Sequence, residues 1–257
     1  MKFHFFKYQA TGNDFILIDN RSGNLSFSKE QIGKLCDRRF GVGADGLILI
    51  EKDPTADFGV NYYNSDGSQS LCGNGSRAAV HFASQLGITN GKASFGAYDG
   101  LHDAELLHSG IVRLKMNDVN AVDRVGEDYL IDTGSPHYIK FVTGIQDFPV
   151  VEEGKAIRYS ERFREQGVNV NFVEILEWNA IFVRTYERGV EDETLSCGTG
   201  VTASALATTF SGFKSPVHVR TRGGELQVEF KTGHSGIFQD IFLIGPAKMV
   251  FEGNLEL

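Results

Sequence analysis

The feature that most constrains the fold of this chain is a segment that occurs twice. Leu71-Cys-Gly-Asn-Gly-Ser-Arg and Ser196-Cys-Gly-Thr-Gly-Val-Thr each place a cysteine before Gly-x-Gly and then continue into small residues. Gly12-Asn-Asp-Phe-Ile also matches Gly134-Ser-Pro-His-Tyr-Ile, and Phe40-Gly-Val-Gly matches Gln166-Gly-Val-Asn. In the first half, 29 residues separate Gly12 from Gly41 and 31 separate Gly41 from Cys72. In the second half, the separations are 33 from Gly134 to Gly167 and 30 from Gly167 to Cys197.

Three marks in one order at similar spacing indicate an ancient duplication, with chance similarity between glycine-rich turns as the alternative. A duplication predicts two like domains related by a pseudo-two-fold axis. We place the first domain at residues 1–118, completed by about 248–257, and the second at 119–247. Equivalent residues, the two cysteines included, are then expected to face each other across the cleft between the domains.

Local patterns predict mixed α and β structure. Ser28 and Gln31 form a capping box, and Cys36 falls on the apolar face of the helix that follows, so we expect it in the core. Another helix is expected to begin after Cys72 and to stop at Gly87, and a polar helix is expected over 158–166. Strands are expected near 2–8, 15–19, 46–51, 58–64, 137–142, 168–176 and 180–186, with further strands towards the end of the chain.

The composition excludes several classes of protein. The net charge of −8 argues against a nucleic-acid or anionic-membrane surface, and no apolar run approaches the length of a membrane span. The first residues do not form a signal peptide, and three cysteines are too few for a disulfide scaffold, so we expect a reducing cytoplasm. No cofactor signature and no metal-ligand spacing is present, and no partner beyond a small molecule is indicated.

A cysteine at the start of a helix is suited to proton transfer. The unpaired N–H groups and partial positive charge of the helix N-terminus favour thiolate over thiol, and they can also hold a carboxylate. Two such cysteines on opposite faces of one α-carbon could remove a proton on one side and return one on the other. The pattern therefore predicts racemisation or epimerisation without a cofactor, and reversible inactivation when oxidation joins the two thiols.

Eight motifs in this order resemble the diaminopimelate epimerase family nearly from end to end. They are Gly12-Asn-Asp-Phe, Gly41-Val-Gly-Ala-Asp-Gly, Asn64-Ser-Asp-Gly-Ser, Cys72-Gly-Asn-Gly, Gly134-Ser-Pro-His, Val168-Asn, Tyr186-Glu-Arg-Gly and Cys197-Gly-Thr-Gly. The resemblance implies an α+β fold of two similar domains, each a curled, mostly antiparallel sheet around a central helix. It also implies a small amino-acid substrate in lysine and peptidoglycan precursor biosynthesis, and a homodimer as one possible assembly.

Carried over by residue, the resemblance makes Cys72 and Cys197 the acid/base pair, with Cys197 as the base towards the LL isomer and His137 beside the site. Glu187 and Arg188 are expected to meet substrate charges, since arginine can bind a carboxylate in bidentate fashion. Gly46 and Ser135 depart from the family pattern. Some members have a substrate-contacting glutamine at the position of Gly46, and the pattern has asparagine at the position of Ser135. The positions that match family substrate-binding residues are Asn13, Asn64, Gly73, Asn74, Asn169, Glu187, Arg188, Gly198 and Thr199.

Three other functions remain open from the residues alone. A related cofactor-free racemase could act on a shorter amino acid such as proline or histidine, which would leave Asn64, Asn169 and Arg188 without a second amino-acid group to bind. A redox protein could use Cys72 and Cys197 as a regulatory disulfide, and a non-catalytic protein could simply bind an amino acid. The histidines His4, His81, His102, His108, His218 and His234 form no constellation, and we expect them to be structural.

Overall fold

The computed structural model describes residues 1–233 and 236–257, so His234 lies outside the described residues. The chain divides into two compact units. Unit 1 comprises Met1–Leu114 and Gly245–Leu257, and unit 2 comprises Lys115–Ile244. Unit 2 is therefore inserted between two parts of unit 1.

Unit 1 consists mostly of strands, with one long helix, α2, between β4 and β5. Its elements are β1 (Lys2–Ala10), β2 (Asn13–Asp19), α1 (Lys29–Cys36), β3 (Gly46–Glu51), β4 (Phe58–Asn64), α2 (Gly73–Gln85), β5 (Lys92–Ala97), β6 (Gly100–Leu106), the 3₁₀ turn η1 (His108–Gly110), β7 (Ile111–Lys115) and β17 (Lys248–Glu256).

Unit 2 has the same alternation of strands and helices. Its elements are β8 (Asp123–Val125), β9 (Asp128–Asp132), β10 (Pro136–Phe141), η2 (Ile145–Asp147), α3 (Val150–Arg158), β11 (Asn169–Glu177), β12 (Ala180–Glu187), β13 (Asp192–Thr194), α4 (Gly198–Ala207), η3 (Thr208–Ser211), β14 (Val217–Thr221), β15 (Gly224–Thr232) and β16 (Phe238–Pro246), whose last residues belong to unit 1.

The strands pair in the same order in both units. In unit 1, β1–β2 is antiparallel, β2–β3 parallel, β3–β4 antiparallel, β4–β5 parallel, and β5–β6–β7 antiparallel. In unit 2 the same series runs through β9–β10, β10–β11, β11–β12, β12–β14 and β14–β15–β16. The helices α2 and α4 stand at equivalent places, each before the fifth strand of its series, which supports the duplication.

One of the three sequence matches that predicted the repeat does not join equivalent positions in the structure. Phe15 pairs with Gly46, and its counterpart His137 pairs with Asn169, so Gly46 and Asn169 are the matching positions. Gly41 lies five residues before β3, whereas Gly167 lies two residues before β11. The match between Gly41 and Gly167 is therefore a likeness of turn sequences, and the loops before the two strands differ.

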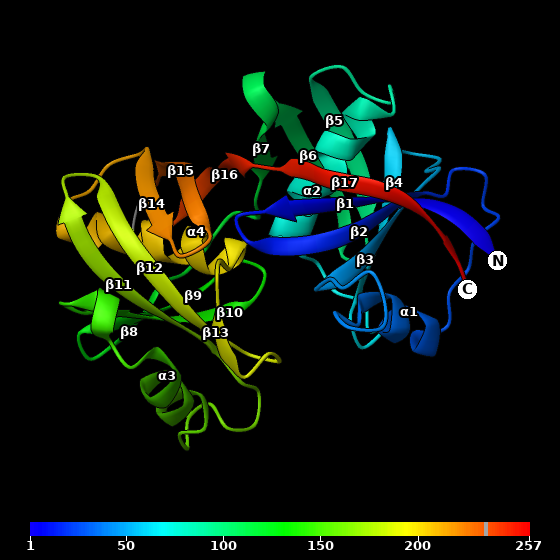
Figure 1. Cartoon of the computed structure of the whole chain (residues 1–257). Helices are drawn as coiled ribbons and strands as arrows, with labels where there is room; N and C mark the ends of the chain where they lie inside the picture. The colour runs from blue at the N-terminus through cyan, green and yellow to red at the C-terminus, as the bar shows by residue number, and fades with distance from the viewer. Residues whose placement is uncertain (234–235) are drawn as a thin grey trace. The chain divides into compact units, whose positions relative to one another are not determined.

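In each unit the strands surround a central helix, which confirms the predicted α+β fold. Helix α2 packs against β1–β4, β6 and β17, and α4 packs against β9–β12, β14 and β15. Figure 1 shows β1 and β17 crossing α2 in unit 1, and α4 beside β14 and β15 in unit 2. Glycine, alanine, serine and threonine make up most of α4, so strands can approach the helix from many directions.

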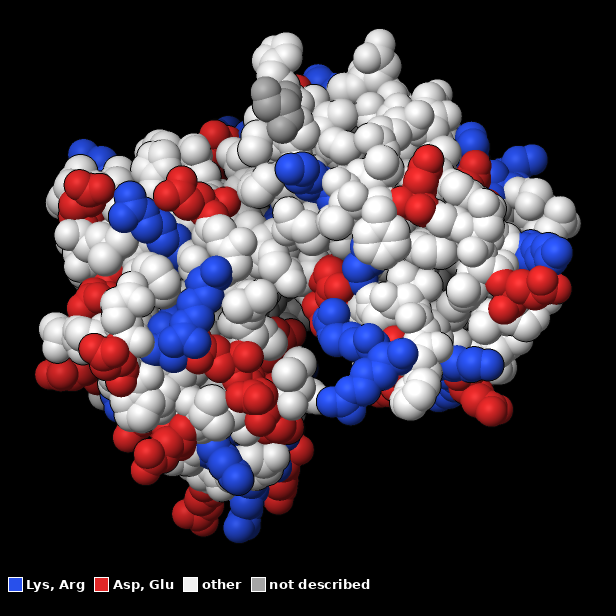
Figure 2. Space-filling view, viewed as in Figure 1, with Lys and Arg blue, Asp and Glu red and all other residues white. Residues whose placement is uncertain are grey.

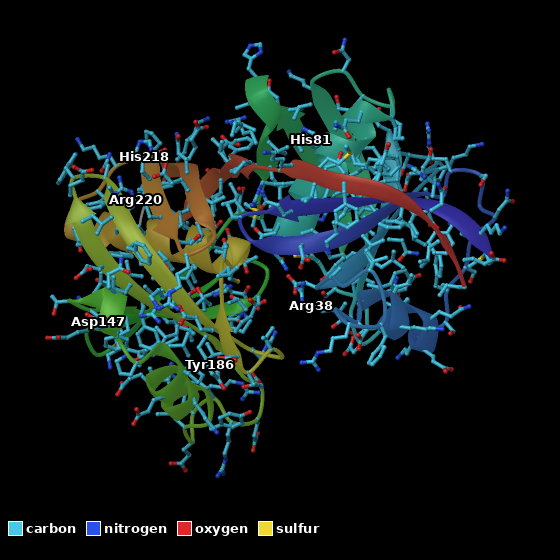
Figure 3. The ribbon with its side chains drawn as sticks, viewed as in Figure 1. Arg38, His81, Asp147, Tyr186, His218 and Arg220 are labelled. Atoms are coloured by element: carbon cyan, nitrogen blue, oxygen red, sulfur yellow. The ribbon has the colours of Figure 1, made fainter. Side chains whose placement is uncertain are left out.

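The outer helices show where local sequence patterns succeed and fail. The capping box of Ser28 and Gln31 is present at α1, and Cys36 lies in the core below it, as predicted. The helix expected over 158–166 is wrong, because α3 spans Val150–Arg158. Gly154 brings α3 close to β12, where a Cβ would lie 2.4 Å from Cβ of Tyr186, the residue labelled beside α3 in Figure 3.

Candidate functional site

The predicted site residues fall into two groups, one in each unit. We call the residues around Cys72 the Cys72 half-site and those around Cys197 the Cys197 half-site. Each cysteine is the N-cap of the central helix of its unit, with extended backbone (φ −129°, ψ 110° at Cys72 and φ −114°, ψ 112° at Cys197). The duplicated motif thus places a thiol at the exposed N–H groups of each buried helix, where negative charge is favoured.

In the Cys72 half-site, the sulfur has both a donor and an acceptor within reach. The backbone N–H of Gly75 donates to Cys72 Sγ over 3.4 Å, and Cys72 Sγ lies 3.5 Å from Asn13 Oδ1. The Asn74 side-chain amide also donates to Asn13 Oδ1 (3.4 Å). This combination can serve a thiol, which donates to Asn13, and a thiolate, which accepts from Gly75.

The orientation of Asn13 is fixed by the carboxylate of Asp45, a residue that the sequence analysis did not single out. Asn13 Nδ2 donates to Asp45 Oδ2, which also accepts from the backbone N–H of Asp14 (3.1 Å). Burial acts to raise the pKa of Asp14, but hydrogen bonds from Arg38 and Lys7 outweigh it and hold that pKa at about 2. Figure 3 shows Arg38 reaching out from the segment after α1.

Arg77 is a buried cation in helix α2, five residues after Cys72. Its side chain is fully buried, and one nitrogen donates to Thr11 Oγ1 (3.1 Å), while Nε and Nη1 make no hydrogen bond. Burial lowers the pKa of Arg77 to about 10, and the charge of Cys72 acts in the opposite direction. A guanidinium in this position favours the thiolate form of Cys72.

Asn64 ends β4 and orders the loop that leads to Cys72. Its amide donates to the hydroxyls of Ser68 (3.0 Å) and Ser70 (3.1 Å), and its Oδ1 accepts from Tyr62 (2.9 Å). The departure at Gly46 is explained by the same tyrosine. A Cβ at position 46 would lie 2.5 Å from Cε2 of Tyr62, so the ring occupies the space that a longer side chain would need.

In the Cys197 half-site, a threonine hydroxyl lies next to the sulfur. Thr199 Oγ1 is 3.5 Å from Cys197 Sγ and 2.9 Å from His137 Nε2. Thr133 donates to the backbone carbonyl of Thr199 (2.9 Å), which fixes the first turn of α4 against β9. Cys197 itself is only 8% exposed, whereas Cys72 is partly exposed.

His137, at the start of β10, is completely buried behind Thr199. Its Nδ1 lies 3.0 Å from the side-chain nitrogen of Asn171. Burial, together with the positive charge of Arg188, lowers the pKa of His137 to about 3, although the Asn171 hydrogen bond acts to raise it. The imidazole is therefore neutral at physiological pH.

Asn169 ties the Glu187–Arg188 corner to the start of β10. Its Nδ2 donates to Ser135 Oγ (2.8 Å) and to the carbonyl of Pro136 (3.2 Å), while its Oδ1 accepts from the backbone N–H of Arg188 (2.9 Å). The serine at position 135 thus supplies a hydroxyl partner where the family pattern has an amide. The Arg188 side chain donates to Gln166 O (2.9 Å) from one nitrogen.

The structure brings Asn13 and Asn74 to Cys72, with Gly73 in the first turn of α2. It brings Thr199 to Cys197, with Gly198 in the first turn of α4 and His137 behind Thr199. Asn64 and Asn169 make hydrogen bonds that shape the loops beside the half-sites, and Glu187 ends β12 next to Arg188. Sequence reasoning missed Asp45, Arg77 and Asn171, and also Thr185, whose hydroxyl donates to Asn171 Oδ1 (2.9 Å). For Asn171, the alternation Asn169-Val-Asn in an otherwise apolar strand was an available signal, since residues two apart share a face.

Outside the half-sites, the surface carries charged side chains of both signs (Figure 2). Figure 2 shows lysine and arginine mixed with aspartate and glutamate over the visible face. Within residues 1–233 and 236–257, no group of three or more His, Cys, Asp and Glu side chains is arranged to hold a metal ion. Over the same described ranges, none of the helices has the length and apolar character that crossing a membrane would require.

Comparison with known sequences matches the chain over almost its whole length. A family model described as diaminopimelate epimerase matches residues 5–122 and 129–250, one segment in each half. Diaminopimelate epimerase of Flavobacterium psychrophilum is 49% identical, covering 97% of this chain and 99% of that protein. The enzyme of the same name from Chlorobaculum tepidum is 43% identical, covering 96% of this chain and 99% of the other.

Solved structures share the fold at low sequence identity. A phenazine biosynthesis protein of the PhzF family from Bacillus anthracis superposes with a TM-score of 0.78 at 13% identity, covering 100% of both chains. A hydroxyproline epimerase from Agrobacterium vitis gives a TM-score of 0.71 at 15% identity, covering 100% of this chain and 93% of the other. At these identities the likeness concerns the fold alone.

Proposed function

The chain belongs to the diaminopimelate epimerase family, and from this we propose that it interconverts LL- and meso-2,6-diaminopimelate by proton transfer at an α-carbon. The enzyme is an isomerase, and the reaction needs no redox change. The observation that carries the proposal is the pair of N-cap cysteines, Cys72 and Cys197, at equivalent places in two duplicated units.

In the proposed mechanism, both cysteines serve the same α-carbon. Cys197 as thiolate takes the α-proton of the LL isomer, and the electrons of the C–H bond pass into the α-carbon and its carboxylate. Cys72 as thiol then gives its proton to the opposite face, leaving a thiol at Cys197 and a thiolate at Cys72. The reverse reaction exchanges the roles, so no external acid, base or cofactor is consumed.

The helix N-termini supply the stabilisation that this step needs. The N–H groups of Gly73 and Asn74 lie in the first turn of α2, and those of Gly198 and Thr199 in the first turn of α4, and the N-terminus of a helix is suited to a carboxylate. Negative charge grows on that carboxylate as the α-proton leaves, so preorganised donors favour the transition state more than the substrate.

The charged and amide side chains are proposed to bind the rest of the substrate. Diaminopimelate has two ammonium and two carboxylate groups, and amides can donate to one kind and accept from the other. Arg188 and Glu187 suit a carboxylate and an ammonium, respectively. We assign Asn13, Asn64 and Asn169 to the same binding set, and we place Glu187 beside the thiol pair in the catalytic group, to which His137 belongs through its contact with Thr199.

The cellular setting follows from the proposed reaction. A small amino-acid substrate of lysine and peptidoglycan precursor synthesis, and two reactive thiols, suit the reducing cytoplasm. The proposal includes neither pyridoxal phosphate nor a metal, since each half-site has its own acid/base group. A homodimer is included as the proposed assembly, by analogy with the family.

The test is proton NMR of the reduced enzyme with LL-diaminopimelate in D₂O, followed by chiral analysis. We expect loss of the α-proton signal together with formation of the meso isomer. Cys72→Ala and Cys197→Ala should each abolish conversion, whereas Cys36→Ala, which alters a cysteine in the apolar core of unit 1 and not at a helix N-terminus, should retain it. If the wild type shows no exchange, the substrate assignment is wrong, and exchange with another amino acid from a panel would redirect it.

A further inference from the structure

The Cys197 half-site contains a continuous chain of hydrogen bonds that reaches the sulfur from the interior of unit 2. The Thr185 hydroxyl donates to Asn171 Oδ1 (2.9 Å), and Asn171 Nδ2 lies 3.0 Å from His137 Nδ1. His137 Nε2 lies 2.9 Å from Thr199 Oγ1, which is 3.5 Å from Cys197 Sγ. Asn171 and Thr185 come from strands β11 and β12, and both are buried.

The direction of this chain is fixed at Asn171. Its Nδ2 also faces the carbonyl oxygen of Tyr138 at 3.3 Å, and only a donor can face a carbonyl. The amide nitrogen therefore points to His137 and the amide oxygen to Thr185. Gly200 leaves room for this arrangement, because a Cβ there would lie 2.2 Å from Asn171 Oδ1.

The fixed amide determines which tautomer His137 adopts. With Asn171 donating, the neutral ring must accept at Nδ1 and carry its hydrogen on Nε2. The Nε2–H then donates to Thr199 Oγ1, so the threonine's own hydrogen is available to Cys197 Sγ. The positive charge of Arg188 also disfavours protonation of His137.

We propose that Asn171 is a positioning residue which, through the Nε2–H tautomer of His137 and the hydroxyl of Thr199, supports the thiolate form of Cys197. Every hydrogen in the chain then points towards the sulfur. In this arrangement His137 orients a donor and does not itself take the substrate's proton. When Cys197 becomes a thiol during turnover, only the Thr199 hydroxyl has to rotate, because the imidazole and the amide keep their orientation. The inference rests on the proposed function in one respect, namely that Cys197 exchanges protons with substrate.

The test measures thiol reactivity without substrate. Wild type, Thr199→Val and Thr199→Ser are alkylated with iodoacetamide over a range of pH, and the peptides of Cys197 and Cys72 are quantified separately by mass spectrometry. Because a hydrogen bond to a charged group corresponds to about a tenfold change in equilibrium or more, Thr199→Val should slow Cys197 alkylation at neutral pH about tenfold. Thr199→Ser should retain the wild-type rate, and Cys72 should be unaffected in both.

Thr208→Val is the matched control. Thr208, directly after α4, is fully buried whereas Thr199 is partly exposed, and the Thr208 hydroxyl donates to Ala205 O (2.6 Å) and takes no part in the chain. It should leave Cys197 reactivity unchanged. Equal rates for Thr199→Val and the wild type would overturn the proposal, as would equal slowing by Thr208→Val.

The role of Asn171 is read from ¹⁵N NMR of the His137 ring. The wild type should show protonated Nε2 and unprotonated Nδ1 across the neutral range. Asn171→Leu should introduce the Nδ1–H tautomer and slow Cys197 alkylation, whereas Thr185→Val tests the same link if the leucine variant does not fold. An Nδ1–H tautomer or an imidazolium in the wild type would refute the inference. None of these measurements uses diaminopimelate, so they can succeed even if the D₂O exchange test fails.

Discussion

At the scale of single residues, the two cysteines have the same backbone setting but different surroundings. Cys72 has a buried cation in its helix, Arg77, whereas the residue at the same distance after Cys197 is Thr202, whose hydroxyl donates to Gly198 O (3.0 Å). Cys197 instead contacts a hydroxyl that is backed by a neutral imidazole. The two copies of the cysteine site therefore differ. A buried positive charge lies in the helix of Cys72, whereas neutral hydrogen-bonding groups lie beside Cys197.

Arg77→Met tests the contribution of the buried charge. Removal of a buried guanidinium that has two nitrogens without hydrogen bonds should leave the free energy of unfolding equal or higher, because burial of charge is costly. The same change should slow alkylation of Cys72 at neutral pH while Cys197 serves as the internal reference. Urea unfolding and peptide-resolved alkylation measure the two effects. A destabilised variant with unchanged Cys72 reactivity would contradict a role for Arg77 at the thiol.

The buried imidazole predicts a pH dependence of stability. The pKa of His137 is about 3 in the folded state and about 6.5 in an unfolded chain, so between these values only the unfolded state takes up the proton. Stability from this group is therefore complete above the unfolded value and is lost as the pH falls. Between pH 7 and pH 5 the loss should be about 2 kcal/mol. Urea unfolding at both pH values measures it.

His137→Gln should remove that component, leaving a smaller difference between pH 7 and pH 5. His218→Gln, at an exposed position, is the control and should keep the wild-type difference. His81, whose pKa is also lowered by burial, adds in the same direction, so some dependence should remain. An undiminished difference in His137→Gln would mean that other groups account for the acid sensitivity.

At the scale of elements, the two central helices tolerate different amounts of added volume. Gly75 and Gly200 both stand three residues after their cysteines. A Cβ at Gly75 would first meet the end of the Ile48 side chain at 3.3 Å, whereas at Gly200 it would lie 2.2 Å from Asn171 Oδ1. At Gly200 the space is filled by the side-chain amide of Asn171. Three hydrogen bonds hold this amide in place, so its displacement costs more free energy than a movement of the Ile48 side chain.

Gly200→Ala should therefore destabilise the protein by about 1–3 kcal/mol, the usual range for overpacking, and Gly75→Ala should cost less. Thermal unfolding of the two variants compares them directly. Gly200→Ala should also disturb the His137 ring signals, because the added methyl displaces Asn171. Equal stabilities would show that unit 2 can move its strand away from the helix.

The elements also show how far sequence reasoning reaches. Continuous apolar runs such as Leu47-Ile-Leu-Ile marked a buried strand, and the Ser28 capping box marked a helix start, because both patterns act through neighbouring residues. Helix α3 was misplaced because its position depends on the close approach of Gly154 to Tyr186, which are far apart in sequence. Arg77, Asp45 and Asn171 escaped notice for the same reason, since their burial and partners arise only when distant strands come together.

At the scale of the whole molecule, the proposed function requires both units to contribute to one reaction. If Cys72 and Cys197 serve the same α-carbon, mild oxidation should join them and abolish activity until a reductant is added. Peptide mapping of the oxidised protein identifies the pair. Cys36 is an internal control, because burial raises the pKa of its thiol to about 11, which disfavours the reactive thiolate. Equal activity in oxidised and reduced samples would contradict the proposal that the two thiols serve one α-carbon.

Strand β17 makes the order of synthesis matter. It pairs with β1 from Lys2 to Gln9, yet it lies beyond the whole of unit 2 in the chain. During translation, unit 2 therefore has all its residues available while β1 still lacks its neighbour on one edge. Domains usually complete folding in the order in which they are made. Here unit 1, which begins first, should finish folding last. In a growing chain, unit 2 with α4 and Cys197 is then folded before β17 completes unit 1, which contains α2 and Cys72.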